Sequence, residues 1–439
     1  MYHLRSSFHD TFLAFTILCL LITKASAVRH NIPDNNEYCN EDDHSCSASN
    51  DPKSLQTTTI SNDVEPNCTL LAIGVDSIGH LNDLKVLSKY MNAMTVSYKD
   101  ADPFRNANDD KCVVRLFLEW IPLYIQSING DLIRDGYIVH DDWIAPLKEE
   151  GLNSGRIWFM PNIDLMDQVS LFHPGLELIL CKTRQCVDWI GSLRKMFALD
   201  VPIMYTGFTT EAPIMVDVDN RNVHRDFSKF LHSPGKSGFK GTLATIMAWK
   251  QNPHFPKLTL KTYHNDLVNH IISKGLRLSD NIEHIDEIMS REEYNVMLYE
   301  HGVHVCASDG EGFGHYINEA RAIGAAVITS DYPPMNEMFR NRDTAVLSKP
   351  LSSTTAKNGM PIMFQSMDGK ELAEAVEEML SKTEQERMRM GQLANIEYKK
   401  DKEAFQKRAK SVRCMLGLLF HNIGSSVQQL AEQCGISLE

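Results

Sequence analysis

Short apolar runs alternate with amphipathic stretches along most of the chain from residue 70 onward. In the first half, the runs with the length and composition of buried β-strands are residues 70–75, 94–98, 113–120, 157–161 and 176–181. Stretches with helical spacing lie between them, at 80–92 and 183–196. Strands that alternate with helices predict βαβ units built around a parallel sheet.

The same alternation repeats in the second half of the chain. The strand-like runs there are residues 228–232, 258–263, 282–288, 303–307, 325–330 and 344–347. The helix-like stretches are residues 241–250, 266–274, 292–300, 315–323 and 371–380. After residue 383 a long, highly charged helical pattern continues to about residue 419. The predicted fold class is therefore α/β, with two doubly wound Rossmann-like domains and a C-terminal helix that packs back across both.

The pattern divides the chain into five predicted segments. They are a signal peptide at 1–27, a disordered stem at 28–66, a Rossmann-like domain at 67–208, a second Rossmann-like domain at 209–400 and a helical segment at 401–439. The junction between the two domains is placed in 205–225, where glycine, proline and polar residues suit a hinge.

The N-terminus has the features of a secretory signal. Arg5 supplies a positive charge, residues 11–23 form an apolar stretch, and Ala25-Ser26-Ala27 fits the small-x-small cleavage pattern. The apolar stretch is shorter than the roughly 20 residues that span a bilayer, which favours cleavage over retention as a signal anchor. We therefore expect the protein in the secretory pathway, either in the ER or Golgi lumen or secreted. Asn67-Cys68-Thr69 is then a glycosylation sequon with Asn67 as acceptor.

Composition and charge narrow the class of protein. The 439 residues are 43% hydrophobic and 23% charged, which is too apolar for a disordered chain. With 44 Lys+Arg against 57 Asp+Glu, the net charge is -13, which argues against a nucleic-acid partner. No apolar segment long enough to span a membrane follows the N-terminus, so a span is expected only if the signal is retained as an anchor.

The chain has 10 cysteines, and cleavage of the signal removes one of them. An oxidising compartment permits disulfides, and the odd remainder predicts a free thiol or an intermolecular bridge. Cys39 and Cys46 lie close enough in sequence to form a small loop. Cys181 and Cys186 are too strained for a simple bridge if both lie on one helix. No Cys/His spacing indicates a zinc site.

The strongest chemical signal is the segment Glu311-Gly312-Phe313-Gly314-His315-Tyr316-Ile317-Asn318-Glu319-Ala320. It follows a predicted buried strand and opens a predicted helix, so its glycines lie where parallel α/β sheets bind ligands. The free N–H groups of the helix favour an anion there. Glu311 and Glu319 bracket this turn, and carboxylates accept hydrogen bonds from sugar hydroxyls. A nucleotide sugar, with an anionic centre and a polyol at each end, fits this arrangement.

A second glycine-rich loop follows the first strand of the second domain. It reads His232-Ser233-Pro234-Gly235-Lys236-Ser237-Gly238-Phe239-Lys240-Gly241-Thr242 and leads into a predicted helix. Lys236 and Lys240 add positive charge to backbone donors, as a phosphate-binding loop would. The loop is not a Walker A motif, because no Lys follows its last glycine.

These residues resemble the E-x7-E motif of retaining glycosyltransferases with two Rossmann domains, the GT-B class, and especially the family 4 or group 1 glycosyl transferases. The loop Asp331-Tyr-Pro-Pro-Met-Asn-Glu337 resembles the one that follows the next strand in that family. The resemblance implies that Glu311 contacts the donor sugar, that Glu319 holds the ribose, and that the intervening residues bind the donor. These are Gly312, Phe313, Gly314 and His315.

The resemblance also implies that the second domain binds the nucleotide sugar and the first domain binds the acceptor. It assigns the diphosphate to Gly235, Lys236 and Lys240, with Lys236 where the family usually has Arg and a spacing shorter by one residue. Lysine is a point charge and does not grip phosphate bidentately, so the geometry of this loop departs from that of the family. His80 and His140 are candidate sugar contacts from the first domain.

The triplet Asp217-Val218-Asp219 matches the D-x-D pattern that binds a metal in the other glycosyltransferase fold class. It lies between the domains, away from a strand end, and solvated acids explain it better. With lysines and a helix dipole available to the leaving diphosphate, we expect neither a metal nor another cofactor.

The function expected from these features is retaining, metal-independent transfer of a hexose from a nucleotide sugar to a glycan, protein or lipid acceptor that the sequence does not identify. The alternatives are a nucleotide-sugar epimerase of the same fold and a secreted, non-catalytic binding protein for carbohydrate or nucleotide. The epimerase would need extra acid–base groups in the cleft.

Overall fold

The computed structural model describes most of the chain after residue 67. The described residues are 68–74, 78–97, 112–118, 125–126, 132–134, 137–138, 156–164, 166, 168–173, 175–213, 224–263, 266–273, 277–351 and 366–439. The predicted signal peptide and stem, Asn67, His140, the D-x-D triplet Asp217–Asp219, Cys39 and Cys46 lie outside these residues.

The first six-stranded sheet is parallel and has the order β2-β1-β3-β7-β8-β9. Its strands are β1 (Thr69–Gly74), β2 (Met94–Ser97), β3 (Val113–Phe117), β7 (Arg156–Phe159), β8 (Leu176–Cys181) and β9 (Ile203–Tyr205). Nearly every residue of β1, β3, β7 and β8 is buried, as expected for a parallel sheet covered on both faces.

Two helices and a 3₁₀ turn belong to this first domain: α2 (Ile78–Met91), α5 (Arg184–Phe197) and η3 (Gln168–Phe172). Helix α5 starts where its sequence supplies a cap, since the Thr183 side chain accepts the N–H of Cys186. It ends at Ala198, which has the left-handed backbone conformation common at helix C-termini (φ 50°).

The second six-stranded sheet is also parallel and has the order β12-β11-β10-β13-β14-β15, the strand order of a Rossmann fold. Its strands are β10 (Asp226–Gly235), β11 (Leu258–Thr262), β12 (Ile282–Asp286), β13 (His301–Cys306), β14 (Ala326–Ser330) and β15 (Val346–Ser348). The accompanying helices are α7 (Thr242–Gln251), α8 (Asp266–Ser273), α9 (Arg291–Glu300), α10 (His315–Ile323) and α11 (Gly369–Ser381), with 3₁₀ turns η4 (Asn336–Met338) and η5 (Arg342–Thr344).

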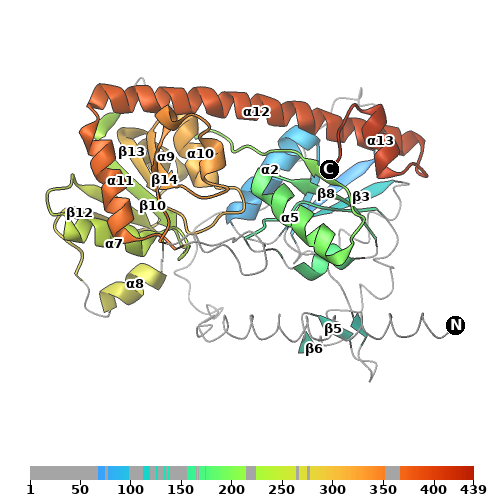
Figure 1. Ribbon diagram of the computed structural model, residues 1–439, viewed down its shortest axis with the longest axis horizontal. Helices are drawn as coiled ribbons and strands as arrows, with labels where there is room; N and C mark the ends of the chain where they lie inside the picture. The colour runs from blue at the N-terminus through green and yellow to red at the C-terminus, as the bar shows by residue number, and fades with distance from the viewer. Residues whose placement is uncertain are drawn as a thin grey trace. The chain divides into compact units, whose positions relative to one another are not determined.

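Helix α12 (Glu384–His421) connects the cores of the two Rossmann-like domains (Figure 1). A capping box between Thr383 and Glu386 starts it. Its early residue Met390 packs in the core of the second domain, whereas Phe405 and Met415 pack in the core of the first. The predicted return of the C-terminal helix across both domains is therefore confirmed, and the predicted segment boundary at 400/401 falls inside this uninterrupted helix.

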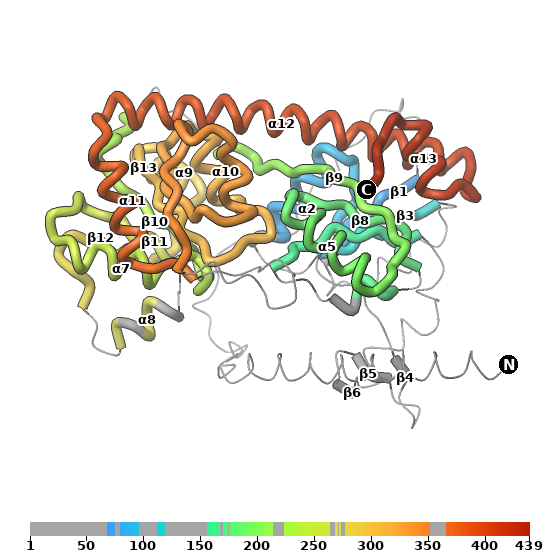
Figure 2. Tube along the Cα trace, viewed as in Figure 1, coloured from blue at the N-terminus to red at the C-terminus, as the bar shows by residue number. Residues whose placement is uncertain are grey.

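The chain then closes on the first domain through α13 (Val427–Gln433) and its last residue. Ile203 of β9 and Glu439 exchange two backbone hydrogen bonds, of 3.1 and 2.8 Å, beside the edge of the first sheet (Figure 2). The first domain therefore includes C-terminal residues in its core.

Three short strands form a separate antiparallel sheet of order β4-β5-β6 in a unit distinct from the one that holds both parallel sheets. They are β4 (Ile125–Gln126), β5 (Leu132–Arg134) and β6 (Tyr137–Ile138). In the part of the chain that the structure describes, no helix combines the length and the apolar character needed to cross a membrane.

Three disulfides join described cysteines: Cys68–Cys112, Cys181–Cys186 and Cys414–Cys434. The Cys181–Cys186 bridge forms because Cys181 ends strand β8 and only Cys186 lies on helix α5, so the helical strain expected for this pair does not arise. Among the described cysteines, Cys306 is a buried free thiol, as the odd count predicts.

The parallel sheets confirm the predicted α/β class with two Rossmann-like domains. Every strand predicted in the two domains has a counterpart, usually with ends that differ by one to three residues. Strand β9, the antiparallel sheet and helix α13 were not predicted, because short strands and short helices leave little periodic pattern. The numerical domain boundaries stay predictions.

Phe405→Ala and Ile396→Ala test whether α12 stabilises the first domain. Phe405 is fully buried and its ring packs edge-on against Tyr90 and Phe208, whereas Ile396 on the same helix is 47% exposed. We expect Phe405→Ala to lower the free energy of unfolding by about 3–5 kcal/mol and Ile396→Ala by less than about 1 kcal/mol. Urea unfolding curves measure both, and equal losses would show that α12 does not hold the core.

Candidate active site

Two helices begin beside each other at the carboxyl edge of the second sheet, and both begin on a glycine. Strands β10 and β13 are neighbours, and they lead into α7 and α10, whose N-cap residues are Gly241 (φ 63°) and Gly314 (φ 90°). A left-handed backbone at both positions favours glycine. Neither N-cap residue has a side chain that accepts a first-turn N–H. A helix N-terminus without such a cap is a place where an anion is favoured.

Glu311 lies between these two helices and is held within the second domain. It is 6% exposed, and its Oε1 accepts hydrogen bonds from the Lys240 ammonium and the Ser308 hydroxyl. The same hydroxyl lies 2.6 Å from the hydroxyl of Tyr316. The structure therefore brings together Glu311 and Lys240, which the sequence places on different loops.

Glu319 is buried in the second turn of α10, as the predicted helix required. Its Oε1 lies 3.3 Å from a guanidinium nitrogen of Arg291, at the start of α9. Burial raises the pKa of Glu319, and the charge of Arg291 opposes that rise. Arg291 is more than half exposed, whereas the Glu319 side chain is buried.

Gly312 contacts the first domain. A Cβ atom built on Gly312 would lie 2.6 Å from Oδ1 of Asn162 and 2.6 Å from Oδ1 of Asp164. Both residues follow strand β7 of the first sheet. Side chains of the first domain therefore lie against the backbone of the Glu311–Glu319 segment, and a Cβ at position 312 would force them to shift.

Phe313 anchors the same segment by its side chain. Its ring is buried and lies 5.2 Å from the ring of Phe208 in an edge-to-face arrangement. Phe313 belongs to the hydrophobic cluster of the first domain although it follows a strand of the second. The resemblance assigned this residue a backbone contact to the donor; the structure adds a packing role for the side chain.

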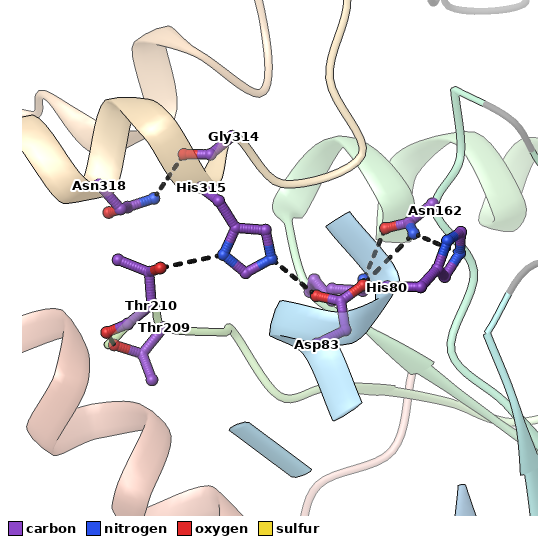
Figure 3. A network of polar contacts seen from close by, with 9 residues as sticks. His80, Asp83, Asn162, Thr209, Thr210, Gly314, His315 and Asn318 are labelled. Carbon is purple, nitrogen blue, oxygen red and sulfur yellow. Dashed lines mark hydrogen bonds and ion pairs between the residues drawn. The ribbon is translucent and has the colours of Figure 1, made fainter. Parts of the chain in front are cut away.

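Figure 3 shows a polar network that starts from His315, the first residue of α10. Its Nε2 lies 2.9 Å from Oδ1 of Asp83 on α2, and its Nδ1 lies 3.0 Å from Oγ1 of Thr210. Because a carboxylate only accepts, Nε2 carries a proton. His315, predicted as a donor-binding residue, is thereby tied to the first domain.

Asp83 and Lys182 form the buried centre of this network. Lys182 Nζ lies 2.6 Å from Asp83 Oδ2, and both side chains are 2% exposed or less. Although burial alone would raise it, the Lys182 ammonium and the hydrogen bond from His315 hold the pKa of Asp83 well below its ordinary value. Lys182 also donates to Asn162 Oδ1.

His80, a predicted sugar contact, is a buried member of the same network. Its Nε2 lies 3.0 Å from the Asn162 amide nitrogen, which donates to it (Figure 3). Burial, and then the Lys182 ammonium, lowers the pKa of His80 to about 4, so the imidazole is neutral at physiological pH. One ring nitrogen of His80 is thus already used by the protein.

The glycine-rich loop predicted at residues 232–242 to bind phosphate starts later in the structure than the sequence predicted. Strand β10 extends to Gly235, so the turn begins at Lys236. Lys236 is exposed, with its ammonium 4.6 Å from the ring centre of Tyr263 at the end of β11, whereas Lys240 reaches Glu311. Of the two predicted lysines, Lys240 is the one that the structure joins to the Glu311–Glu319 segment.

Five residues of the site were not predicted from the sequence: Asp83, Asn162, Asp164, Lys182 and Arg291. Position is the signal that could have indicated four of them, because Lys182 directly follows β8, Asn162 and Asp164 lie in the loop after β7, and Arg291 follows β12. Asp83 lies within helix α2 and has no such signal. Among the described residues, no group of three His, Cys, Asp or Glu side chains is arranged to hold a metal ion. Metal independence stays a prediction.

Residues 268–395 match the family model described as "Glycosyl transferases group 1". The chain therefore contains a glycosyl transferases group 1 domain. The matched residues include Glu311, which pairs with Lys240, and the whole of α10. Lys240 itself lies before the matched range. No curated protein sequence matches the chain.

Solved structures share the GT-B fold of this chain. The crystal structure of Anabaena Alr3699/HepE in complex with UDP and glucose is 11% identical, with a TM-score of 0.53, covering 79% of this chain and 99% of that one. An alpha,alpha-trehalose-phosphate synthase (UDP-forming) from Burkholderia vietnamiensis is 9% identical, with a TM-score of 0.50, covering 72% and 75% of the two chains. At these identities the likeness concerns the fold alone.

Gly312→Ala tests the contact of this glycine with the first domain. The added methyl group would clash with Asn162 and Asp164, so we expect the free energy of unfolding to fall by about 1–3 kcal/mol. Gly238→Ala is the control, because a Cβ there meets no atom within 4 Å. Thermal and urea unfolding measure both variants; equal stability of the two would contradict the contact.

Proposed function

We propose that this protein is a glycosyltransferase that moves a hexose from a nucleotide sugar to an acceptor, with retention of anomeric configuration and without a metal. The observation that carries the proposal is the place of Glu311 and Glu319. Both lie in the segment that matches the group 1 family, next to two glycine-started helices without side-chain caps.

The donor binds to the second domain in this proposal, with its diphosphate at the N-termini of α7 and α10. Lys240 lies beside both loops, and its present partner is Glu311. An incoming diphosphate can take this ammonium as its counter-ion and leave Glu311 to bind the sugar. Glu319 is then free to exchange Arg291 for the ribose hydroxyls. Uridine is the first candidate base, since the Anabaena protein of similar fold was crystallised with UDP.

Charge stabilisation of the leaving diphosphate is the main catalytic step that these residues can supply. The backbone N–H groups of two helices and the Lys240 ammonium are fixed before the bond breaks, so they need little reorganisation as negative charge develops. The contact of Asn162 and Asp164 with Gly312 brings the first domain against the sugar end, where it excludes water from the donor. The acceptor approaches from the first domain. The likeness of Glu311–Glu319 to the E-x7-E motif supports retention.

We also propose that the protein works in the secretory pathway. The three disulfides between described cysteines support an oxidising compartment. They agree with the predicted signal peptide and with the predicted glycan on Asn67.

The direct test incubates the purified chain with nucleotide sugars, with and without candidate glycan, protein and lipid acceptors. Acceptor-dependent release of nucleoside diphosphate supports transfer. Conversion of the donor sugar to an isomer without release would indicate the epimerase, and binding without any turnover would indicate the binding protein.

Metal independence predicts that transfer persists in excess EDTA. The reason is that Lys240 and the two helix N-termini already supply the positive potential which a metal would provide. Initial rates are compared before and after chelation. A complete loss of activity that manganese restores would contradict the prediction.

Glu311→Gln and Glu319→Gln are expected to affect different kinetic constants. Glu319 binds the ribose equally in ground and transition states, so its substitution should raise KM for the donor more than it lowers kcat. Glu311 lies at the sugar, where charge develops, so its substitution should lower kcat. Each change should cost about ten- to a hundredfold in kcat/KM, the loss expected for one charged hydrogen bond.

The control for this pair is Glu374→Gln, an exposed acid on α11 of the same domain. Steady-state kinetics with the best donor of the panel provide the measurement. Folded Glu311 and Glu319 variants that keep wild-type kcat and KM would remove the main support for the proposal.

A further inference from the structure

Asp164 places a carboxylate of the first domain directly against the Glu311–Glu319 segment of the second. It lies in the turn after β7, and its Oδ1 faces the Gly312 backbone, 2.6 Å from where a Cβ would stand. Asn162 reaches the same point, but its amide is already engaged by His80 and Lys182. Asp164 is thus the residue at this contact with an oxygen still to be satisfied.

That oxygen is shielded from solvent and has no hydrogen-bond partner in the structure. A buried acceptor left unpaired costs free energy, and a ligand hydroxyl that donates to it removes the cost. The oxygen therefore has the chemistry to recognise a hydroxyl group next to Gly312.

Of the three neighbouring carboxylates Asp83, Asp164 and Glu311, Asp164 is the one whose charge is not matched by a lysine. Lys240 and Lys182 are the cations that act on it, and each already has a carboxylate partner, Glu311 and Asp83 respectively. Burial, followed by the nearby Glu311 carboxylate, raises the pKa of Asp164 to about 6, while Lys240, a hydrogen bond from the residue's own backbone and Lys182 oppose the rise. Asp164 is accordingly charged for the most part at neutral pH.

We propose that Asp164 binds a hydroxyl group of the donor sugar and makes this site selective for an uncharged sugar over a uronic acid. The inference rests on the proposed function, which places the donor sugar at Glu311 and Gly312. A hydroxyl donates to Asp164 Oδ1, whereas the carboxylate of a uronic acid would add a third negative charge beside Asp164 and Glu311. The repulsion increases when Lys240 turns from Glu311 to the diphosphate.

The experiment measures the Kd of UDP, UDP-glucose and UDP-glucuronic acid by calorimetry for the full chain and two variants. Asp164→Ala removes the acceptor oxygen. We expect it to raise the Kd of UDP-glucose by at least about tenfold and to leave the Kd of UDP as in the wild type. Asp164→Asn keeps the shape and an acceptor oxygen but removes the charge. We expect it to lower the preference for UDP-glucose over UDP-glucuronic acid by about tenfold.

A change of pH provides a second readout in the wild type. Lowering the pH from 7.5 to 5 protonates Asp164, so the preference for UDP-glucose over UDP-glucuronic acid should shrink. The preference of Asp164→Asn should change less over the same range. Asp188→Asn, an exposed acid on α5, is the matched control and should keep the wild-type affinities.

The outcomes separate this inference from the proposed function. If UDP binds but Asp164→Asn keeps the wild-type preference between the two sugars, Asp164 does not select the donor sugar and the proposed function stands. Unchanged donor affinities with slower transfer would assign the hydroxyl to the acceptor and overturn the inference as well. If the wild-type chain binds none of the three nucleotides, the proposed uridine donor fails, and this inference fails with it.

Discussion

The arrangement of the site depends on the hydrogen bonds and ion pair of one buried carboxylate, that of Asp83. It accepts from Lys182 at the end of the first sheet and from His315 at the start of α10, so one side chain of α2 fixes residues of both Rossmann-like domains. Removing one partner of such a buried pair leaves an uncompensated charge, which costs about 3–5 kcal/mol. Because His315 directly follows Gly314, this carboxylate helps to position the Glu311–Glu319 segment relative to the first domain.

Two further acids of the site each pair with a cation, whereas Oδ1 of Asp164 has no hydrogen-bond partner. Glu311 is matched by Lys240 and Glu319 by Arg291, and in each pair the cation is the more exposed member. In the proposed function, a diphosphate would compete for the lysine, and sugar hydroxyls would compete for the two acids. The buried Asp83–Lys182 pair is different, since neither side chain is accessible for exchange. The site thus combines one buried ion pair with two pairs whose cations are partly exposed. Under the proposed function, the buried pair positions the two domains and the other two pairs bind the donor.

The sequence predicted those parts of the fold and site that depend on local pattern. The parallel strands were visible as buried apolar runs, and Glu311 and Glu319 as acids around a glycine turn between a strand and a helix. It did not predict Asp83, Asn162, Asp164 or Lys182, because their roles arise from contacts between residues far apart in the chain. Asp83 lies in the middle of a helix, where an acid normally indicates a solvated face. The return of α12 was predicted, but its completion of the first core through Phe405 required the structure.

Helix capping distinguishes the two glycine-started helices from five other described helices. Helices α5, α9, α11, α12 and α13 each begin with a Ser, Thr or Asp side chain that accepts a first-turn N–H. A side-chain cap of this kind stabilises a helix by about 1 kcal/mol. Helices α7 and α10 lack the cap and start at neighbouring strands, where the order of the sheet reverses. Packing accounts for Gly241, because a Cβ there would lie 1.8 Å from the Ala307 carbonyl oxygen. The proposed diphosphate would bind where these two caps are missing, and it would supply the partner for the first-turn N–H groups that a cap supplies elsewhere.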